Sequence, residues 1–397
     1  MTWKRRRSTG VFVAAHFFTS VGFGLYSTGT VIYFNRVVGL SPSQVGIGLS
    51  VSGLLWIALA VPVGRLVDRV GPREAAVVAG LSLALALAVA AHARSFETYL
   101  AVIAAVGFLE QTAIIAGNAL LAGVVADDDR VPLLALLRSV FNVGLTVGVL
   151  LTGLAVAAGS PAGYRWLFLG AAAAAAAAAA VTTVQPRVAG APAGGRGPWS
   201  ALADLPYVSL AVVGGLVTVH DVILGVGLPL WIVSWTQAPA AVAAWVIGLN
   251  TVLVVALQVR ASRLAVTVDG ARRLQRRACV AVALACVVFG LTRGPTAGPA
   301  TALLILGVVV LTAGELWSSA ANWRLRFAFA DPTAQGQYAG VFSLGIALRG
   351  VIGPVLVATL IGGLRSIGWI VLALFFALMF LLINPVVETA GRRLRSA

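Results

Sequence analysis

Long apolar segments alternate with short polar ones along nearly the whole of this 397-residue chain. A helix needs about 20 mostly apolar residues to cross the hydrocarbon core of a bilayer, and twelve segments meet that requirement. They lie at about residues 11–34, 44–64, 74–93, 97–126, 131–157, 164–185, 205–235, 241–259, 278–292, 299–327, 337–362 and 367–385. Only 10% of the residues are charged, against about 25% in soluble domains. The sequence therefore predicts an all-α integral membrane protein with twelve transmembrane helices, whose main partner is the lipid bilayer.

The basic residues are concentrated in the loops on one side of the expected membrane. If both termini are cytoplasmic, the cytoplasmic segments carry about four times as many Lys and Arg residues as the outer loops, the bias that orients membrane proteins. This distribution accounts for most of the net charge of +15, so we expect no nucleic-acid partner. Lys4 is the only lysine, and residues 171–180 are all alanine, as is typical of a GC-rich genome. We expect a bacterial cytoplasmic (inner) membrane protein with cytoplasmic N- and C-termini.

The two halves of the chain repeat each other at an offset near 200 residues. IGLS at 47–50 recurs as IGLN at 247–250. Further pairs are Asn118 with Asn322, Asp127 with Asp331, Phe141 with Phe342, and Gly144 with Gly345. Such internal repeats are common in transporter folds. We expect two pseudo-symmetric six-helix bundles, over residues 1–186 and 205–397, joined by a cytoplasmic linker at 187–204 that is rich in Pro, Gly and Ala.

The loop between the second and third segments has the sequence PVGRLVDRVGPRE, residues 62–74. Charge this dense must lie at a membrane surface, because each charge at the bilayer centre costs about 2.5–3.5 kcal/mol or more. The pattern resembles the loop G-x-L-x-D-R-x-G-x-R between helices 2 and 3 of the major facilitator superfamily. Every position is filled, by Gly64, Leu66, Asp68, Arg69, Gly71 and Arg73.

The resemblance extends over essentially the whole chain and implies a conformational latch. In the family the aspartate of this loop meets the start of helix 11, which here assigns that role to Asp68, and the loop arginines meet an acid at the end of helix 4, for which Asp127 is the best-placed candidate. Alternatively, Arg69 and Arg73 only enforce topology. The fifth segment, GLTVGVLLTG at 144–153, partly resembles the G-x-x-x-G-P motif of exporters, with a valine in place of the proline.

Ionisable side chains inside apolar segments are candidates for coupling transport to proton movement, because they are costly in a membrane. They are Glu110, Asp221, Glu315, Arg138, Arg349, His16 and His220. In the family, helices 1, 4, 7 and 10 line the central cavity. Three of these four helices therefore carry a carboxylate here.

Asp221 is the first candidate for a proton carrier. Burial disfavours the ionised form of a carboxylate and a bound cation favours it, so proton and substrate can compete for one site. His220 points about 100° away around an ideal helix and need not pair with it. The alternative is a packing pair between Asp221 and an arginine. Glu110 and Glu315 have the same two interpretations, with Arg138 and Arg349 respectively as partners.

Five further side chains are candidates for contact with a substrate, because aromatic rings stack on flat or cationic molecules and amides form hydrogen bonds. They are Tyr26, Asn118, Trp231, Trp317 and Asn322. Polar residues also serve helix–helix contacts in lipid, which is the competing interpretation.

These features together predict a monomeric secondary active transporter that moves a small organic molecule by alternating access. The intramembrane carboxylates and the lack of a nucleotide-binding loop favour proton-driven export, with the proton gradient as energy source and no cofactor. Uptake of a metabolite or nutrient is the first alternative, and a non-transporting receptor or assembly factor a distant one.

Cys279 and Cys286 are too far apart along one helix for a disulfide and have no histidine nearby, so we expect no metal site. The sequence contains no constellation of a nucleophile and a base that would indicate an enzyme.

Overall fold

The computed structural model describes residues 3–157, 161–188 and 200–396, which form helices and no strand. The first half contains α1 (Trp3–Arg36), α2 (Pro42–Val70), α3 (Pro72–Ala90), α4 (Phe96–Val124), α5 (Asp127–Ala157) and α6 (Pro161–Thr182). The second half contains α7 (Ser200–Ala203), α8 (Leu205–Val217), α9 (His220–Val222), the π-helix η1 (Ile223–Gly227), α10 (Leu228–Trp235), α11 (Val242–Ser262), α12 (Val268–Gly290), the 3₁₀-helix η2 (Leu291–Arg293), α13 (Ala297–Phe329), α14 (Gln335–Leu364) and α15 (Ser366–Ser396).

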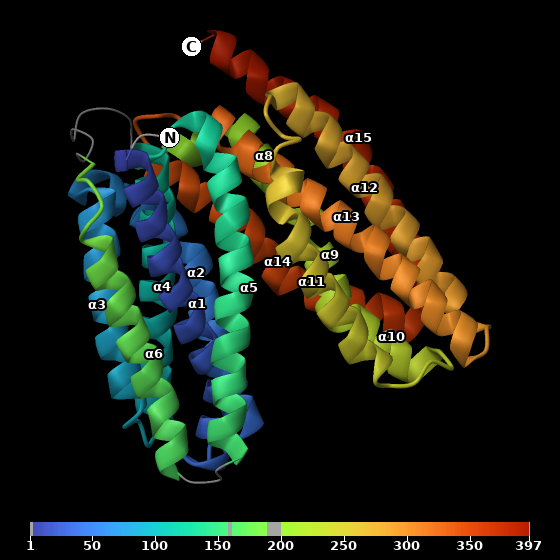
Figure 1. Cartoon of the computed structure of the whole chain (residues 1–397), viewed down its shortest axis with the longest axis horizontal. Coiled ribbons are helices and arrows are strands. Elements are labelled where there is room, and N and C mark those ends of the chain that lie inside the picture. Colours follow the sequence, from blue (N-terminus) through green and yellow to red (C-terminus); the bar gives the residue numbers. More distant parts are fainter. Residues whose placement is uncertain (1–2, 158–160, 189–199, 397) are drawn as a thin grey trace. The chain divides into compact units, whose positions relative to one another are not determined.

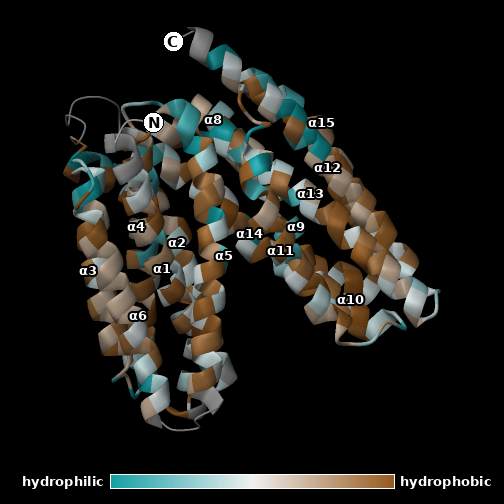
Figure 2. Cartoon of the chain, in the orientation of Figure 1, coloured by the Kyte–Doolittle hydropathy of each residue, from teal (hydrophilic) through white to brown (hydrophobic). Residues whose placement is uncertain are grey.

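Twelve of the described helical segments are long and apolar enough to cross a membrane, counting α8 to α10 as one. Apolar residues run along the middle of these helices, and hydrophilic residues gather towards their ends (Figure 2). The protein is a multi-pass membrane protein with twelve spans, which confirms the expectation from the sequence.

The chain divides into two compact units (Figure 1). The first comprises Met1–Ala201 with Asp331–Gly340, and the second comprises Leu202–Ala330 with Val341–Ala397. In the first, α1 packs on α5 and α6, and α4 packs on α2 and α3; in the second, α12 packs on α13 and α15. The expected linker, 187–204, lies largely at 189–199, outside the described residues.

Glycines allow two helix pairs to approach closely, one pair in each unit. A Cβ on Gly148 of α5 would lie 2.4 Å from the carbonyl oxygen of Val21 in α1. In the second unit a Cβ on Gly345 of α14 would lie 2.0 Å from the carbonyl oxygen of Ala211 in α8. Small residues serve this purpose in membrane helices, where close backbone approach strengthens packing. The glycines of the motif-like stretch 144–153 thus have a packing role against α1.

We expect Gly148→Val to destabilise the first unit by about 1–3 kcal/mol, the usual cost of overpacking. Gly153→Val on the same helix is the matched control, because nothing lies within 4 Å of a Cβ built there. Thermal unfolding of the two purified variants in detergent measures the difference. Equal melting temperatures would contradict this account of the α1–α5 contact.

The seventh segment spans Leu205–Trp235, as expected, but its backbone is interrupted. The amide of Asp221 donates to the carbonyl of Thr218, three residues back, whereas the amide of Leu228 donates to Ile223, five residues back. Pro229 has no N–H to donate, so the ordinary helical pattern cannot pass through this turn. The helix is first tightened and then widened, and His220 and Asp221 lie at the irregular turns. Such π-turns frequently mark functional sites.

The ninth segment is longer than the expected 278–292. It is α12, which begins ten residues earlier at Val268, where the hydroxyl of Thr267 accepts a hydrogen bond from the Gly270 amide at 3.0 Å. Arg272, Arg273, Arg276 and Arg277 therefore belong to the helix instead of a loop. One of them, Arg272, binds Glu388 of α15 at 3.2 Å and so ties the two helices together.

Candidate functional site

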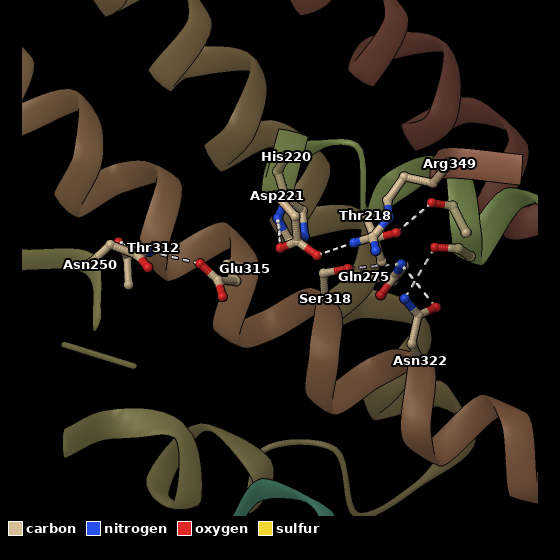
Figure 3. A network of polar contacts seen from close by, with 12 residues as sticks. Thr218, His220, Asp221, Asn250, Gln275, Thr312, Glu315, Ser318, Asn322 and Arg349 are labelled. Carbon is tan, nitrogen blue, oxygen red and sulfur yellow. Dashed lines mark hydrogen bonds and ion pairs between the residues drawn. The ribbon is translucent and has the colours of Figure 1, made fainter. Parts of the chain in front are cut away.

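Asp221 and Arg349 form an ion pair in the second unit (Figure 3). A guanidinium nitrogen of Arg349, on α14, donates to Oδ2 of Asp221, on α9. The other carboxylate oxygen, Oδ1, lies 3.1 Å from Nδ1 of His220. The Asp221 side chain is 30% exposed and that of His220 only 2%, so the carboxylate is open to water or ligand while the imidazole is enclosed. His220 and Asp221 thus belong to one cluster. In an ideal helix their side chains would point about 100° apart.

Glu315 of α13 completes this cluster (Figure 3). Ligand atoms of His220, Asp221 and Glu315 all lie within 4.8 Å of one another. The amide nitrogen of Asn250, on α11, donates to Oε2 of Glu315 at 2.8 Å and also to the hydroxyl of Thr312 at 3.0 Å. Asn250 was missed by the sequence analysis as a site residue. The sequence does contain a signal for it: an asparagine in an otherwise apolar span is costly without a hydrogen-bond partner, so a polar neighbour is expected.

These contacts decide between two pairings that the sequence left open. Among the described contacts, Arg349 is bonded to Asp221 and Glu315 to Asn250, which favours the Asp221–Arg349 pairing over the expected Glu315–Arg349 pair. In the first unit, Glu110 of α4 makes no hydrogen bond or ion pair with Arg138 among the described residues.

The remaining candidates in the first unit lie on α1, α4 and α5. The ring of His16 is 6.2 Å from that of Phe141, which lies one turn beyond Arg138 on α5. Tyr26 and Asn118 are half-buried. The connected cluster of candidate side chains lies in the second unit.

Asn322, expected to contact substrate, has a packing role. Its Nδ2 donates to the carbonyl of Gly214 in α8 at 3.2 Å, and its Oδ1 accepts from Gln275 of α12 at 3.4 Å. The side chain is 7% exposed. A buried amide that joins three helices favours helix–helix packing over substrate contact at this position.

Trp231, the second substrate candidate that must be reassigned, lies in the core. It is fully buried, and its indole N–H lies 2.8 Å from the hydroxyl of Thr292, which accepts the hydrogen bond. Its ring packs edge-on against Trp369 at 5.7 Å. Trp317, by contrast, is only half-buried on α13 and stays a candidate.

We expect Trp231→Ala to destabilise the protein by about 3–5 kcal/mol, because it leaves a large cavity in the core. Trp317→Ala makes the same chemical change at a half-buried position, and we expect it to alter stability far less. The melting temperatures of both purified variants test this. A small effect at Trp231 would return that residue to the list of substrate contacts.

The motif loop meets the start of α14 within the first unit. Oδ1 of Asp68 accepts from the amide of Gly336 at 2.6 Å, and Oδ2 accepts from Gln337 at 2.9 Å. Unpaired amides and the helix dipole make this end of a helix favourable for negative charge. A Cβ on Gly64 would lie 2.2 Å from the carbonyl oxygen of Gly336, so the motif glycine permits the approach. Gly71 has φ +100°, the left-handed region that favours glycine, and connects α2 to α3.

The loop arginines do not meet Asp127. That residue begins α5 and pairs with Arg130, three positions further along the same helix. Arg73 donates to the carbonyl of Thr183 just beyond α6, where unpaired helix carbonyls attract a cation, and Arg69 is exposed. The expected arginine–acid contact with helix 4 is therefore replaced by a cap on the end of α6.

Comparison with known proteins agrees with this architecture. The sequence profile of the Major Facilitator Superfamily matches residues 12–328, and the chain belongs to that family. No curated protein matches the sequence significantly. The fold and the family define a transporter and not an enzyme.

Solved structures share the fold at low sequence identity. A bacterial homologue of the iron transporter ferroportin, in an outward-facing state, is 14% identical with a TM-score of 0.75, covering 97% of this chain and 99% of its own. The human organic anion transporter MFSD10 is 18% identical with a TM-score of 0.67, covering 97% of this chain and 100% of its own. The proton:xylose symporter XylE is 14% identical with a TM-score of 0.70, covering 94% of each chain.

Proposed function

We propose that this protein is a proton-coupled secondary transporter that exports a small organic molecule by alternating access. It acts as a monomer in the bacterial cytoplasmic membrane with both termini in the cytoplasm, and it uses the proton gradient without a cofactor. The observation that carries the proposal is the ion pair between Asp221, on the interrupted seventh span, and Arg349 of α14. His220 and Glu315 lie beside this pair.

The ion pair supplies a switch that a proton can operate. A proton on Asp221 removes the charge that binds Arg349, so the guanidinium no longer has a full ionic partner at that position. Without the proton, the same carboxylate can attract a cationic substrate, and proton and substrate then exclude each other. Ionisable groups inside spans are costly and are typical of proton relays in transporters.

The second element of the proposal is a latch on the cytoplasmic side. Asp68 binds the first amides of α14, and the glycine contact between α2 and α14 holds these segments together. We propose that this contact forms in one state of the transport cycle and breaks in the other. Arg73, which caps the end of α6, takes no part in the latch.

Uptake of an anionic metabolite or nutrient is the second candidate. Arg138 and Arg349 lie within the spans and favour an anion, and a relative on this fold is an organic anion transporter. Proton coupling itself has a precedent on the fold in the proton:xylose symporter. A proton-coupled transporter of a cationic substrate remains the proposal because the cluster of the second unit contains two carboxylates for one arginine.

Accumulation of a fluorescent lipophilic cation in an efflux-deficient bacterial host tests the proposal. Cells that express the protein should accumulate less dye, and a protonophore should abolish the difference. Higher accumulation of an anionic probe in expressing cells would instead favour uptake. If no probe responds to expression or to the protonophore, proton-driven export of organic cations is contradicted.

A further inference from the structure

We infer that His220, Asp221 and Glu315 form a binding site for a divalent transition-metal cation. Their ligand atoms lie within 4.8 Å of one another, and each side chain supplies one of them. An imidazole nitrogen with two carboxylate oxygens suits Zn²⁺, Mn²⁺, Fe²⁺ or Co²⁺, whereas Mg²⁺ and Ca²⁺ prefer oxygen ligands alone. This departs from the expectation, drawn from the cysteines, that the protein has no metal site.

The state of His220 is an independent observation that indicates a ligand. The residue is 1% exposed. Its Nδ1 lies 3.1 Å from Oδ1 of Asp221, whereas its Nε2 makes no hydrogen bond in the described part of the chain. Buried polar atoms almost always have hydrogen-bond partners, so an Nε2 without one needs an explanation. A metal ion bound to a ring nitrogen supplies it.

The carboxylates are held by groups outside the site, as metal ligands usually are. Arg349 binds Oδ2 of Asp221, and Oδ1 lies 3.1 Å from Nδ1 of His220. Asn250 donates to Oε2 of Glu315 at 2.8 Å and is itself bonded to Thr312. Such outer contacts orient metal ligands and tune their affinity.

The geometry requires a small contraction on binding. Metal–ligand distances of about 2.0–2.2 Å place ligand atoms about 3–4 Å apart, somewhat closer than the 4.8 Å limit here. The irregular backbone at His220 and the adjacent π-turn provide that adjustment more readily than a regular helix, whose hydrogen bonds fix the register. The site lies within one unit, so it does not depend on how the two units are arranged.

Equilibrium binding to the purified protein tests this inference. The protein is prepared in detergent with a non-histidine affinity tag and stripped of metal with a chelator. Titration with Co²⁺, followed by its visible absorption, and with Mn²⁺ by calorimetry should give one ion per chain. An excess of Mg²⁺ should not displace it.

Two variants and two controls decide which residues bind. His220→Gln and Glu315→Gln should each weaken binding about 10–100-fold or more, because each removes a ligand. His92→Gln, outside the cluster, and Glu110→Gln, in the other unit, should bind like the wild type. Size-exclusion profiles check that each variant folds. A further single variant, Asn250→Leu, should weaken binding without removing a ligand.

The inference goes beyond the proposed function and fails separately from it. No ion bound, or equal binding by wild type, His220→Gln and Glu315→Gln, would overturn the metal site. Either result leaves proton-driven export untouched, because the binding is measured without a membrane potential or a pH gradient.

Discussion

Asp221→Asn is expected to abolish proton-driven transport and to leave the protein folded. An amide has nearly the shape of the carboxylate but cannot take up a proton near neutral pH, so the ion pair with Arg349 can no longer be made and broken. Accumulation of the dye should equal that of cells with an empty vector. Exchange of a cationic substrate without a gradient should fall as well, because the amide carries no charge to attract the cation.

The matched control is Asp269→Asn, the same change at an exposed position where the carboxylate pairs with Arg272 at the surface. It should transport like the wild type. Removing one partner of a fully buried ion pair costs about 3–5 kcal/mol, but this pair is partly exposed, 30% at Asp221 and 24% at Arg349, so the cost should be smaller and the variant should fold. The double variant with Arg349→Gln removes the unpaired charge and should restore stability but not coupling. A folded double variant that still concentrates substrate against its gradient would show that Asp221 has only a packing role.

Gly336→Val is expected to shift the protein away from the state in which α2 and α14 are in contact. The new Cβ would lie 2.3 Å from the carbonyl oxygen of Gly64 and 2.7 Å from Oδ1 of Asp68. Relieving this overlap costs about 1–3 kcal/mol, which corresponds to about a 5–150-fold change in a two-state equilibrium. Transport should fall because one half of the cycle is disfavoured.

Thiol labelling measures that shift directly. Ala60 of α2 is 1% exposed, and its carbonyl oxygen would lie 2.4 Å from a Cβ on Gly340 of α14, so a cysteine at position 60, in a protein lacking Cys279 and Cys286, should react slowly. Gly336→Val should speed its reaction with a maleimide, and Asp68→Asn should do so more weakly, because a charge at a helix end contributes about 0.3–2 kcal/mol. Gly362→Val is the control, since nothing lies within 4 Å of a Cβ built there. Equal labelling in the Gly336 and Gly362 variants would contradict the latch.

Much of the architecture could be predicted from the sequence, because burial in lipid leaves a strong one-dimensional signal. Twelve apolar runs gave twelve spans, and the repeat of Gly144 as Gly345 corresponds to equivalent close helix contacts in both units. The contact of Asp68 with the start of α14 follows the family pattern.

What could not be predicted depends on local backbone geometry and on choices among partners. The seventh span is irregular around residues 218–228, and His220 and Asp221 are in contact there, 3.1 Å apart, which the pattern of apolar residues could not indicate. Composition could not decide whether Arg349 binds Asp221 or Glu315, because both pairings satisfy the same charges. Trp231 was misassigned because an aromatic ring in a core and one in a substrate cavity have the same sequence signal.

The most direct test of proton coupling is substrate-driven proton movement in proteoliposomes. Liposomes with the purified protein, a pH-sensitive dye inside and a substrate gradient across the membrane are followed without any imposed pH gradient. The account predicts a change of internal pH with wild-type protein and none with Asp221→Asn. Substrate movement by the wild-type protein with no change of internal pH would contradict proton coupling.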